Sequence, residues 1–211
     1  MEPLPRGRHG LPREFIAANQ RGRLIVAIAE ALDEQGYDGT TVAEVATRAG
    51  VSKSDFYAHF ASKDQCFSAA YDAASERLRN EVLAACPERR EWAEGVCAGL
   101  GAGLAALTAE PAQANLLLVE GLRAGSSVCA RFQAAVESFV RYLRDGAPTT
   151  TGAARPPEAD EAVVGGIASL LGQRVLAGET DRLDRFFPEL AEFALAPYLG
   201  VAEARRIIST R

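Results

Sequence analysis

Histidine, lysine and methionine are scarce in this chain of 211 residues. It contains two histidines (His9 and His59), two lysines and one methionine. Beyond residue 59 the chain therefore has no imidazole for acid–base catalysis or for binding a metal ion. No histidine, cysteine and carboxylate side chains stand at the spacing of a catalytic or metal site. We therefore expect no enzyme, no metal and no cofactor.

Disulfide, zinc and membrane signals are also missing. The four cysteines, at positions 66, 86, 97 and 129, are widely spaced and form no C-x-x-C motif. This favours reduced thiols over disulfides or a zinc site. No apolar run is long enough to cross a bilayer, and the N-terminal MEPLPRGRHG lacks the apolar core of a signal peptide. We expect a soluble, cytoplasmic protein without a membrane partner.

Charge is unevenly distributed along the chain. The net charge is −5, but residues 1–63 hold eight basic and eight acidic side chains, so the remainder carries the whole excess. Of 23 basic residues only Lys53 and Lys63 are lysines. A neutral N-terminal part can still bind a polyanion if its cations gather on one face.

Residues 41–60, TVAEVATRAGVSKSDFYAHF, have the spacing of two short helices joined by a tight turn. Gly50 stands where only glycine turns the chain without steric cost, and Phe56 and Phe60 form the inner face of the second helix. This is the pattern of a helix-turn-helix, whose second helix enters the DNA major groove. Capping pairs at Thr41/Glu44, Ser52/Asp55 and Ser62/Gln65 predict helix starts near residues 42, 53 and 63.

Residues 41–64, TVAEVATRAGVSKSDFYAHFASKD, resemble the DNA-binding region of the TetR family of bacterial transcriptional regulators. The specific part is Ala-Gly-Val-Ser, then Phe-Tyr, then Phe, then Ser-Lys and an acid. The resemblance covers about residues 20–72, and beyond it only length and helical character match. It implies an N-terminal DNA-binding domain, a C-terminal domain with a ligand pocket, and a homodimer.

The start of the second helix carries the hydrogen-bonding side chains that would face DNA. Lys53 can donate to guanine O6 and N7, and Ser54 is small enough to approach a base edge. Asp55 is acidic, so we assign it to capping. By resemblance, Thr41, Tyr57, His59 and Lys63 match positions that touch the DNA backbone, whereas Val42 replaces a polar contact residue. The predicted DNA-binding set is Thr41, Ser52, Lys53, Ser54, Tyr57, His59 and Lys63.

Helical periodicity covers the rest of the chain, and no strand is expected. The expected helices span residues 19–35, 63–85, 91–107, 111–124, 127–145, 158–177, 181–196 and 201–209. The fold class is all-α. We divide the chain into a flexible basic arm (1–18), whose arginines could reach DNA, a three-helix helix-turn-helix domain (19–66), and a helical effector-binding and dimerisation domain (67–211).

The resemblance implies a ligand pocket among the middle helices of the C-terminal domain. Apolar walls with a few polar groups suit such a pocket. The candidates are Trp92, Asn115, Glu120, Phe132, Phe139 and Gln173. Glycines recur at positions 95, 99 and 103, which indicates either close helix packing, the favoured reading, or room for a pocket.

The two helices at 158–177 and 181–196 have apolar stripes wider than one inner face needs. Two such helices from each of two subunits can form a four-helix interface, although a large monomer core would also explain them. The predicted interface residues are Val163, Ile167, Leu170, Leu171, Phe186, Phe187, Leu190 and Phe193.

These observations predict a dimeric, ligand-responsive regulator. It would repress by binding a palindromic DNA operator, and a small apolar or amphipathic effector would release it. The alternatives are a helical adaptor that binds other proteins without an effector and, less favoured, a small helical enzyme. An activator, or a constitutive regulator without a ligand, stays open within the main interpretation. The operator, the regulated genes, the effector and the sign of regulation do not follow from the sequence.

Overall fold

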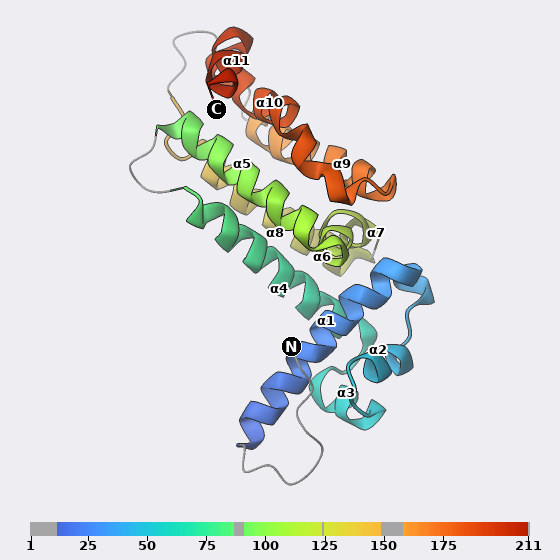
Figure 1. The fold of residues 1–211 in the computed structure, drawn as a ribbon. Coiled ribbons are helices and arrows are strands. Elements are labelled where there is room, and N and C mark those ends of the chain that lie inside the picture. Colours follow the sequence, from blue (N-terminus) through green and yellow to red (C-terminus); the bar gives the residue numbers. More distant parts are fainter. Residues whose placement is uncertain (1–11, 87–90, 124, 149–157, 211) are drawn as a thin grey trace. The chain divides into compact units, whose positions relative to one another are not determined.

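Helices form the whole fold over the residues that the structure describes, with no strand among them (Figure 1). The structure, a computed structural model, describes residues 12–86, 91–123, 125–148 and 158–210. The predicted connection at 146–157 and the predicted arm at 1–18 lie largely outside these residues. The all-α fold class is confirmed. The chain divides into two compact units, and the boundary between them lies inside helix α4, between Ala73 and Ala74.

The first unit contains α1 (Arg13–Gly39), α2 (Val42–Arg48), α3 (Lys53–His59) and the beginning of α4 (Lys63–Ala84). Its core is the predicted stripe of α1 packed against aromatic side chains of α3 and α4. Leu24, Ile28 and Leu32 are buried, as are Phe56 and Phe67. The predicted starts of α2, α3 and α4 are confirmed.

Helix α1 begins earlier than the spacing of its apolar residues predicts. The prediction placed its start near Asn19, but the first helical residue is Arg13. Pro12 precedes it with φ −56°, and its carbonyl oxygen accepts the backbone N–H groups of Phe15 and Ile16. Proline is tolerated there because the first N–H groups of a helix lack an intrahelical partner. Residues 13–18, predicted to belong to a flexible arm, are therefore helical.

The second unit is built on α5 (Trp92–Ala109), which packs against the C-terminal helices. Its other elements are α6 (Pro111–Asn115), a π-helical turn (Leu116–Glu120), α7 (Gly121–Arg123), α8 (Gly125–Arg144), α9 (Ala159–Leu176), a 3₁₀ segment (Thr180–Phe186), α10 (Phe187–Leu199) and α11 (Val201–Ser209). Val96, Cys97, Leu143, Leu195 and Tyr198 lie in its core.

Two of the predicted helices are interrupted. The segment 111–124 contains a π-helical turn, and Gly172 of α9 lies so close to this turn that a Cβ there would stand 2.8 Å from the Leu118 carbonyl oxygen. The segment 181–196 changes from 3₁₀ to α-helix at Phe187 because Pro188 has no N–H to continue the preceding hydrogen-bond ladder.

Helix α5 corrects one expectation about membranes. By length and composition alone it is apolar enough to cross a bilayer, and it is the one such helix among the residues with described structure. Eight of its residues are buried inside the second unit, including Val96, Cys97 and Leu104. A core helix passes the same test of length and composition, and the packing of α5 is that of a core helix.

Candidate functional site

Helices α2 and α3 form a helix-turn-helix with a hydrogen bond at each helix start. The Thr41 hydroxyl accepts the backbone N–H of Glu44 at 3.3 Å and so caps α2. Gly50 makes the turn with φ +64°, and the Val51 N–H donates back to the Ala46 carbonyl oxygen at 2.9 Å. A residue with a Cβ is strained in this left-handed conformation, which explains the glycine.

Helix α3 starts with a reciprocal capping box. The backbone N–H of Asp55 donates to the Ser52 hydroxyl at 3.0 Å, and the Ser52 N–H donates to the Asp55 carboxylate at 3.1 Å. The Ser52 hydroxyl also donates to the same carboxylate at 2.7 Å. These bonds from Ser52, first from its side chain and then from its backbone, lower the pKa of Asp55. The assignment of Asp55 to capping is confirmed.

The outer face of α3 presents the predicted base-reading residues. Phe56 and Phe60 are buried and anchor the helix, with their ring centroids 5.9 Å apart. Lys53 and Ser54 on the first turn are exposed, and Tyr57 on the next turn is 57% exposed. Two hydrogen-bonding side chains, Lys53 and Ser54, therefore stand exposed at the N-terminal end of α3, with Tyr57 one turn further on, and their contact with DNA stays a prediction.

His59 and Lys63, two of the predicted backbone contacts, have partners inside the unit. The His59 ring nitrogen Nε2 lies 3.2 Å from Oε1 of Gln20 on α1. The Lys63 ammonium donates to the carbonyl oxygens of Tyr37 at 2.7 Å and Thr40 at 3.0 Å. It also lies 4.0 Å from the centroid of the Tyr37 ring. Both side chains thus hold elements of the first unit together, and their contact with DNA stays a prediction.

Arg48 on α2 is surrounded by carboxylates. Its guanidinium bonds Glu34 at 2.5 and 2.7 Å and lies within 4 Å of Glu30 and Glu44. The bond to Arg48 lowers the pKa of Glu34. This cation therefore ties α2 to α1 and is neutralised within the unit, whereas the described structure gives Lys53 no ion pair.

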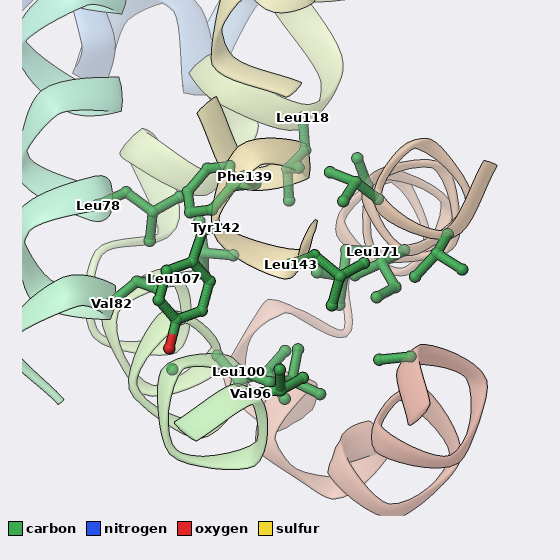
Figure 2. A pocket seen from close by; sticks show the side chains of 18 residues that line it. Leu78, Val82, Val96, Leu100, Leu107, Leu118, Phe139, Tyr142, Leu143 and Leu171 are labelled. Carbon is green, nitrogen blue, oxygen red and sulfur yellow. The ribbon is translucent and has the colours of Figure 1, made fainter. Parts of the chain in front are cut away.

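The second unit contains an apolar cavity of about 170 Å³ that is partly open to solvent (Figure 2). Its walls come from α4, α5, the π-helical turn, α8, α9 and α10. The lining residues are Leu78, Val82, Val96, Gly99, Leu100, Gly103, Leu104, Leu107, Leu118, Phe139, Tyr142, Leu143, Val163, Val164, Ile167, Ala168, Leu171 and Ala194.

The glycines of α5 serve both of the roles considered for them. A Cβ on Gly99 would stand 3.0 Å from both the Cys86 sulfur and a Val82 methyl group, and one on Gly103 would stand 3.2 Å from Val82. These contacts allow α5 to approach α4 closely. Gly99 and Gly103 also line the cavity, where the missing side chains leave room.

One of the six predicted ligand residues, Phe139, lines the cavity. The Trp92 indole donates to the Leu143 carbonyl oxygen at 3.0 Å and packs on Tyr198, so it belongs to the core. Gln173 is exposed on α9, and Glu120 is buried in the π-helical turn. Asn115 and Phe132 are half-buried outside the lining. Spacing alone does not reveal which side of a helix faces a cavity, and contact of these six residues with a ligand stays a prediction.

Sequence reasoning missed Tyr142, whose side chain is the only one with a polar atom among the described residues of the lining. It lies one turn after Phe139 on α8 and next to Leu143, both of which belong to the apolar stripe that predicted this helix. A polar residue inside that stripe was the available signal.

The predicted interface residues divide into two groups. Val163, Leu171 and Leu190 are buried within the second unit, and Ile167 lines the cavity. Leu170 is 42% exposed and Phe193 is 43% exposed. The Phe193 ring packs on Gly166, since a Cβ on that glycine would stand about 3 Å from the ring. Gly166 lies one turn before Leu170 on α9. Phe186 and Phe187 are half-buried. An apolar patch of Leu170 and Phe193 therefore remains uncovered on α9 and α10.

No group of three or more histidine, cysteine or acidic side chains that could hold a metal ion occurs within the described ranges. Cys66, Cys86 and Cys97 form no disulfide bond within the described part of the chain. Cys129 is not described. Burial raises the pKa of Cys66 to about 12, and its sulfur lies 3.8 Å from the Leu24 carbonyl oxygen.

Comparison with known proteins gives matches to the helix-turn-helix and to the fold. Residues 24–70 match the family described as bacterial regulatory proteins, tetR family. Over 72 residues the chain is 36% identical to the HTH-type transcriptional activator FasR of Mycolicibacterium smegmatis, which covers 34% of this chain. The match spans about a third of the length of FasR, 31%.

Solved structures resemble the chain over most of its length. The fatty acid degradation regulator FadR of Bacillus halodurans has a TM-score of 0.72 at 15% identity, over 83% of this chain and 94% of that one. FadR of Bacillus subtilis, solved in complex with stearoyl-CoA, has a TM-score of 0.70 at 15% identity, over 85% and 98%. SmeT, the repressor of the multidrug efflux pump SmeDEF of Stenotrophomonas maltophilia, has a TM-score of 0.67 at 18% identity. The match covers 85% of this chain and 92% of SmeT. At these identities the likeness shows the fold.

Proposed function

From the premise that this chain belongs to the tetR family of bacterial regulatory proteins, we propose that it is a transcriptional regulator that binds an operator as a dimer. The relatives named above are regulators and not enzymes. The observation that carries the proposal is the exposed row of Lys53, Ser54 and Tyr57 on a helix anchored by Phe56. Such a protein acts in the cytoplasm, where bacterial DNA lies.

The position of Lys53 supports a role in DNA binding. It is the first residue of α3, where the positive end of the helix dipole makes a cation unfavourable by about 0.3–1 kcal/mol. The described structure gives Lys53 no hydrogen bond that would offset this cost. A lysine there is explained by a polyanion outside the protein, with Ser54 and Tyr57 beside it on the same face.

The apolar cavity supports a ligand-responsive mechanism. We propose that an effector with an apolar chain binds there and lowers the affinity of the first unit for DNA. The stearoyl-CoA bound by FadR of Bacillus subtilis is an amphipathic ligand of this kind. Thermodynamic linkage then requires DNA to lower effector affinity by the same factor, typically about 5- to 150-fold. We propose that the protein represses transcription when it is bound to its operator and that the effector releases it from the DNA.

Fluorescence anisotropy with DNA from upstream of the gene tests the proposal at fixed salt. We expect the wild-type protein to bind this DNA more tightly than a scrambled duplex, and Lys53→Ala to lose that preference. Arg79→Ala is the matched control, because it removes an exposed cation of the second unit, whose nearest carboxylate is Glu76 at 3.9 Å. Equal weak binding to both duplexes by all three proteins would contradict the proposal and favour the adaptor alternative.

A further inference from the structure

Tyr142 supplies the one polar side-chain atom among the cavity-lining residues that the structure describes. Tyr142 is on α8, and its hydroxyl oxygen reaches α5, where it stands 3.4 Å from the position of a Cβ on Gly95. Figure 2 shows its ring between Val82 and the pair Val96 and Leu100, with the oxygen at the α5 end. A ligand that fills the cavity therefore meets a single hydroxyl group in an otherwise apolar wall.

The protein offers this hydroxyl only a weak partner. Tyr142 is hydrogen-bonded to the thiol of Cys86. The Cys86 sulfur lies 3.2 Å from the carbonyl oxygens of both Val82 and Gly95, so its own proton is directed at the backbone. The sulfur can then only accept from the phenol, and sulfur is a weak acceptor. A carbonyl oxygen of a ligand is a stronger acceptor for the same proton.

The hydroxyl is also a lasting donor. Burial, followed by the hydrogen bond to Cys86, raises the pKa of Tyr142 well above its ordinary value of 10. The phenol therefore keeps its proton throughout the physiological range.

The cavity disfavours a charged group next to this donor. None of the described lining residues carries a charge, so a carboxylate inside it would be buried without a cation. Such burial is costly, and the acid would take up a proton instead. A neutral oxygen acceptor avoids that cost and needs only one hydrogen bond.

We propose that Tyr142 is a specificity-determining residue, whose hydroxyl donates to one neutral carbonyl oxygen of the effector, that of an ester, thioester or ketone on an apolar chain. The proposal rests on the proposed function, because it takes the cavity to be the effector site. It narrows the effector from any apolar molecule to a neutral one with a carbonyl group in its buried part.

Matched ligands and variants test this assignment. The assay measures how well methyl decanoate, dodecane and decanoate each compete with the neutral fluorescent probe N-phenyl-1-naphthylamine for the full-length protein. We expect Tyr142→Phe to weaken the binding of methyl decanoate about two- to tenfold, which corresponds to one hydrogen bond, and to leave the binding of dodecane unchanged. Decanoate should bind more tightly as the pH falls. Tyr198→Phe is the control, because its hydroxyl donates to Asp160 and not into the cavity.

Cys86→Ala supplies a second, opposite readout. Without the thiol the phenol loses its protein acceptor, so methyl decanoate should bind more tightly and dodecane should not. Unchanged binding of methyl decanoate to Tyr142→Phe, an equal loss for dodecane, or tighter binding of decanoate than of its ester at pH 8 would overturn the assignment.

DNA release separates this proposal from the proposed function. If methyl decanoate releases operator DNA equally from wild type and Tyr142→Phe, the function stands and the role of Tyr142 is refuted. If the ester binds with the expected dependence on Tyr142 but never releases DNA, the assignment stands and the regulatory mechanism is wrong. Absence of probe or ligand binding to the wild-type protein would refute both.

Discussion

At the scale of single residues, the two lysines of the chain have different environments. The Lys63 ammonium binds the Tyr37 and Thr40 carbonyl oxygens, at the end of α1 and the start of α2, whereas Lys53 is exposed. Both were predicted to contact DNA from their positions at helix starts. A helix start indicates that a phosphate is favoured there. It does not reveal that two backbone carbonyl oxygens lie within hydrogen-bond distance of the Lys63 ammonium.

Lys63→Met is expected to lower the free energy of unfolding by about 1–2 kcal/mol, because two carbonyl oxygens lose a charged donor while the aliphatic stem is kept. Urea denaturation followed by circular dichroism measures this. Lys53→Met is the matched control, and we expect it to stay within about 0.5 kcal/mol of wild type. Equal stability of the two variants would show that the Lys63 hydrogen bonds contribute nothing in solution.

The buried thiol of Cys66 should make the first unit sensitive to alkali. Its pKa is raised to about 12 in the folded chain from an ordinary value near 9.0. The neutral thiol is thus favoured by folding, so its contribution is fully present below pH 9 and is lost as the pH rises from 9 towards 12. We expect the free energy of unfolding to fall more steeply between pH 9 and 10 in wild type than in Cys66→Ala, by at most about 1.4 kcal/mol per pH unit. Parallel pH profiles would contradict this.

At the scale of helices, periodicity and capping predicted most of what the structure contains. The pairs Ser52/Asp55 and Ser62/Gln65 are local, since the two partners stand only three positions apart in the sequence, and both pairs form the predicted bonds. The cavity is not local. Phe139 and Phe132 share a stripe of α8, yet only Phe139 lines the cavity, because α5 and α9 decide which part of that stripe is covered. Pattern cannot supply this information.

The glycines of α5 give a prediction at this scale. Gly99→Ala places a methyl group 3.0 Å from both Cys86 and Val82, so α4 and α5 must separate slightly. We expect a loss of about 1–3 kcal/mol in the free energy of unfolding, the usual cost of overpacking. Gly101→Ala is the matched control, since its Cβ would meet only the Phe187 ring at 3.8 Å.

The control variant should gain up to about 1 kcal/mol from the better helix propensity of alanine. Both variants are compared with wild type by thermal and urea denaturation. A stabilised Gly99→Ala would mean that α4 and α5 are not in close contact in solution.

At the scale of the whole molecule, the uncovered patch on α9 and α10 bears on assembly. Only part of the wide apolar stripes of these helices is buried. Val163, Leu171 and Leu190 pack in the core of the second unit, whereas Leu170 and Phe193 remain exposed. The apolar pattern alone does not separate the buried residues from the exposed ones. Two large apolar side chains exposed on adjacent helices are better explained by a partner subunit, and the proposed binding of a palindrome needs two copies.

Leu170→Glu is therefore expected to convert a dimer to a monomer, because each copy would bury an unpaired carboxylate in the interface. Sedimentation velocity at micromolar concentration measures the change. Leu83→Glu is the matched control, since Leu83 of α4 is 44% exposed and Leu170 is 42% exposed. The monomeric variant should also lose most of its affinity for the operator, because each copy then binds a half-site alone. Leu83→Glu should keep both the dimeric state and the affinity for the operator. A Leu170→Glu protein that stays dimeric would place the subunit interface elsewhere and leave this patch without a role in DNA binding.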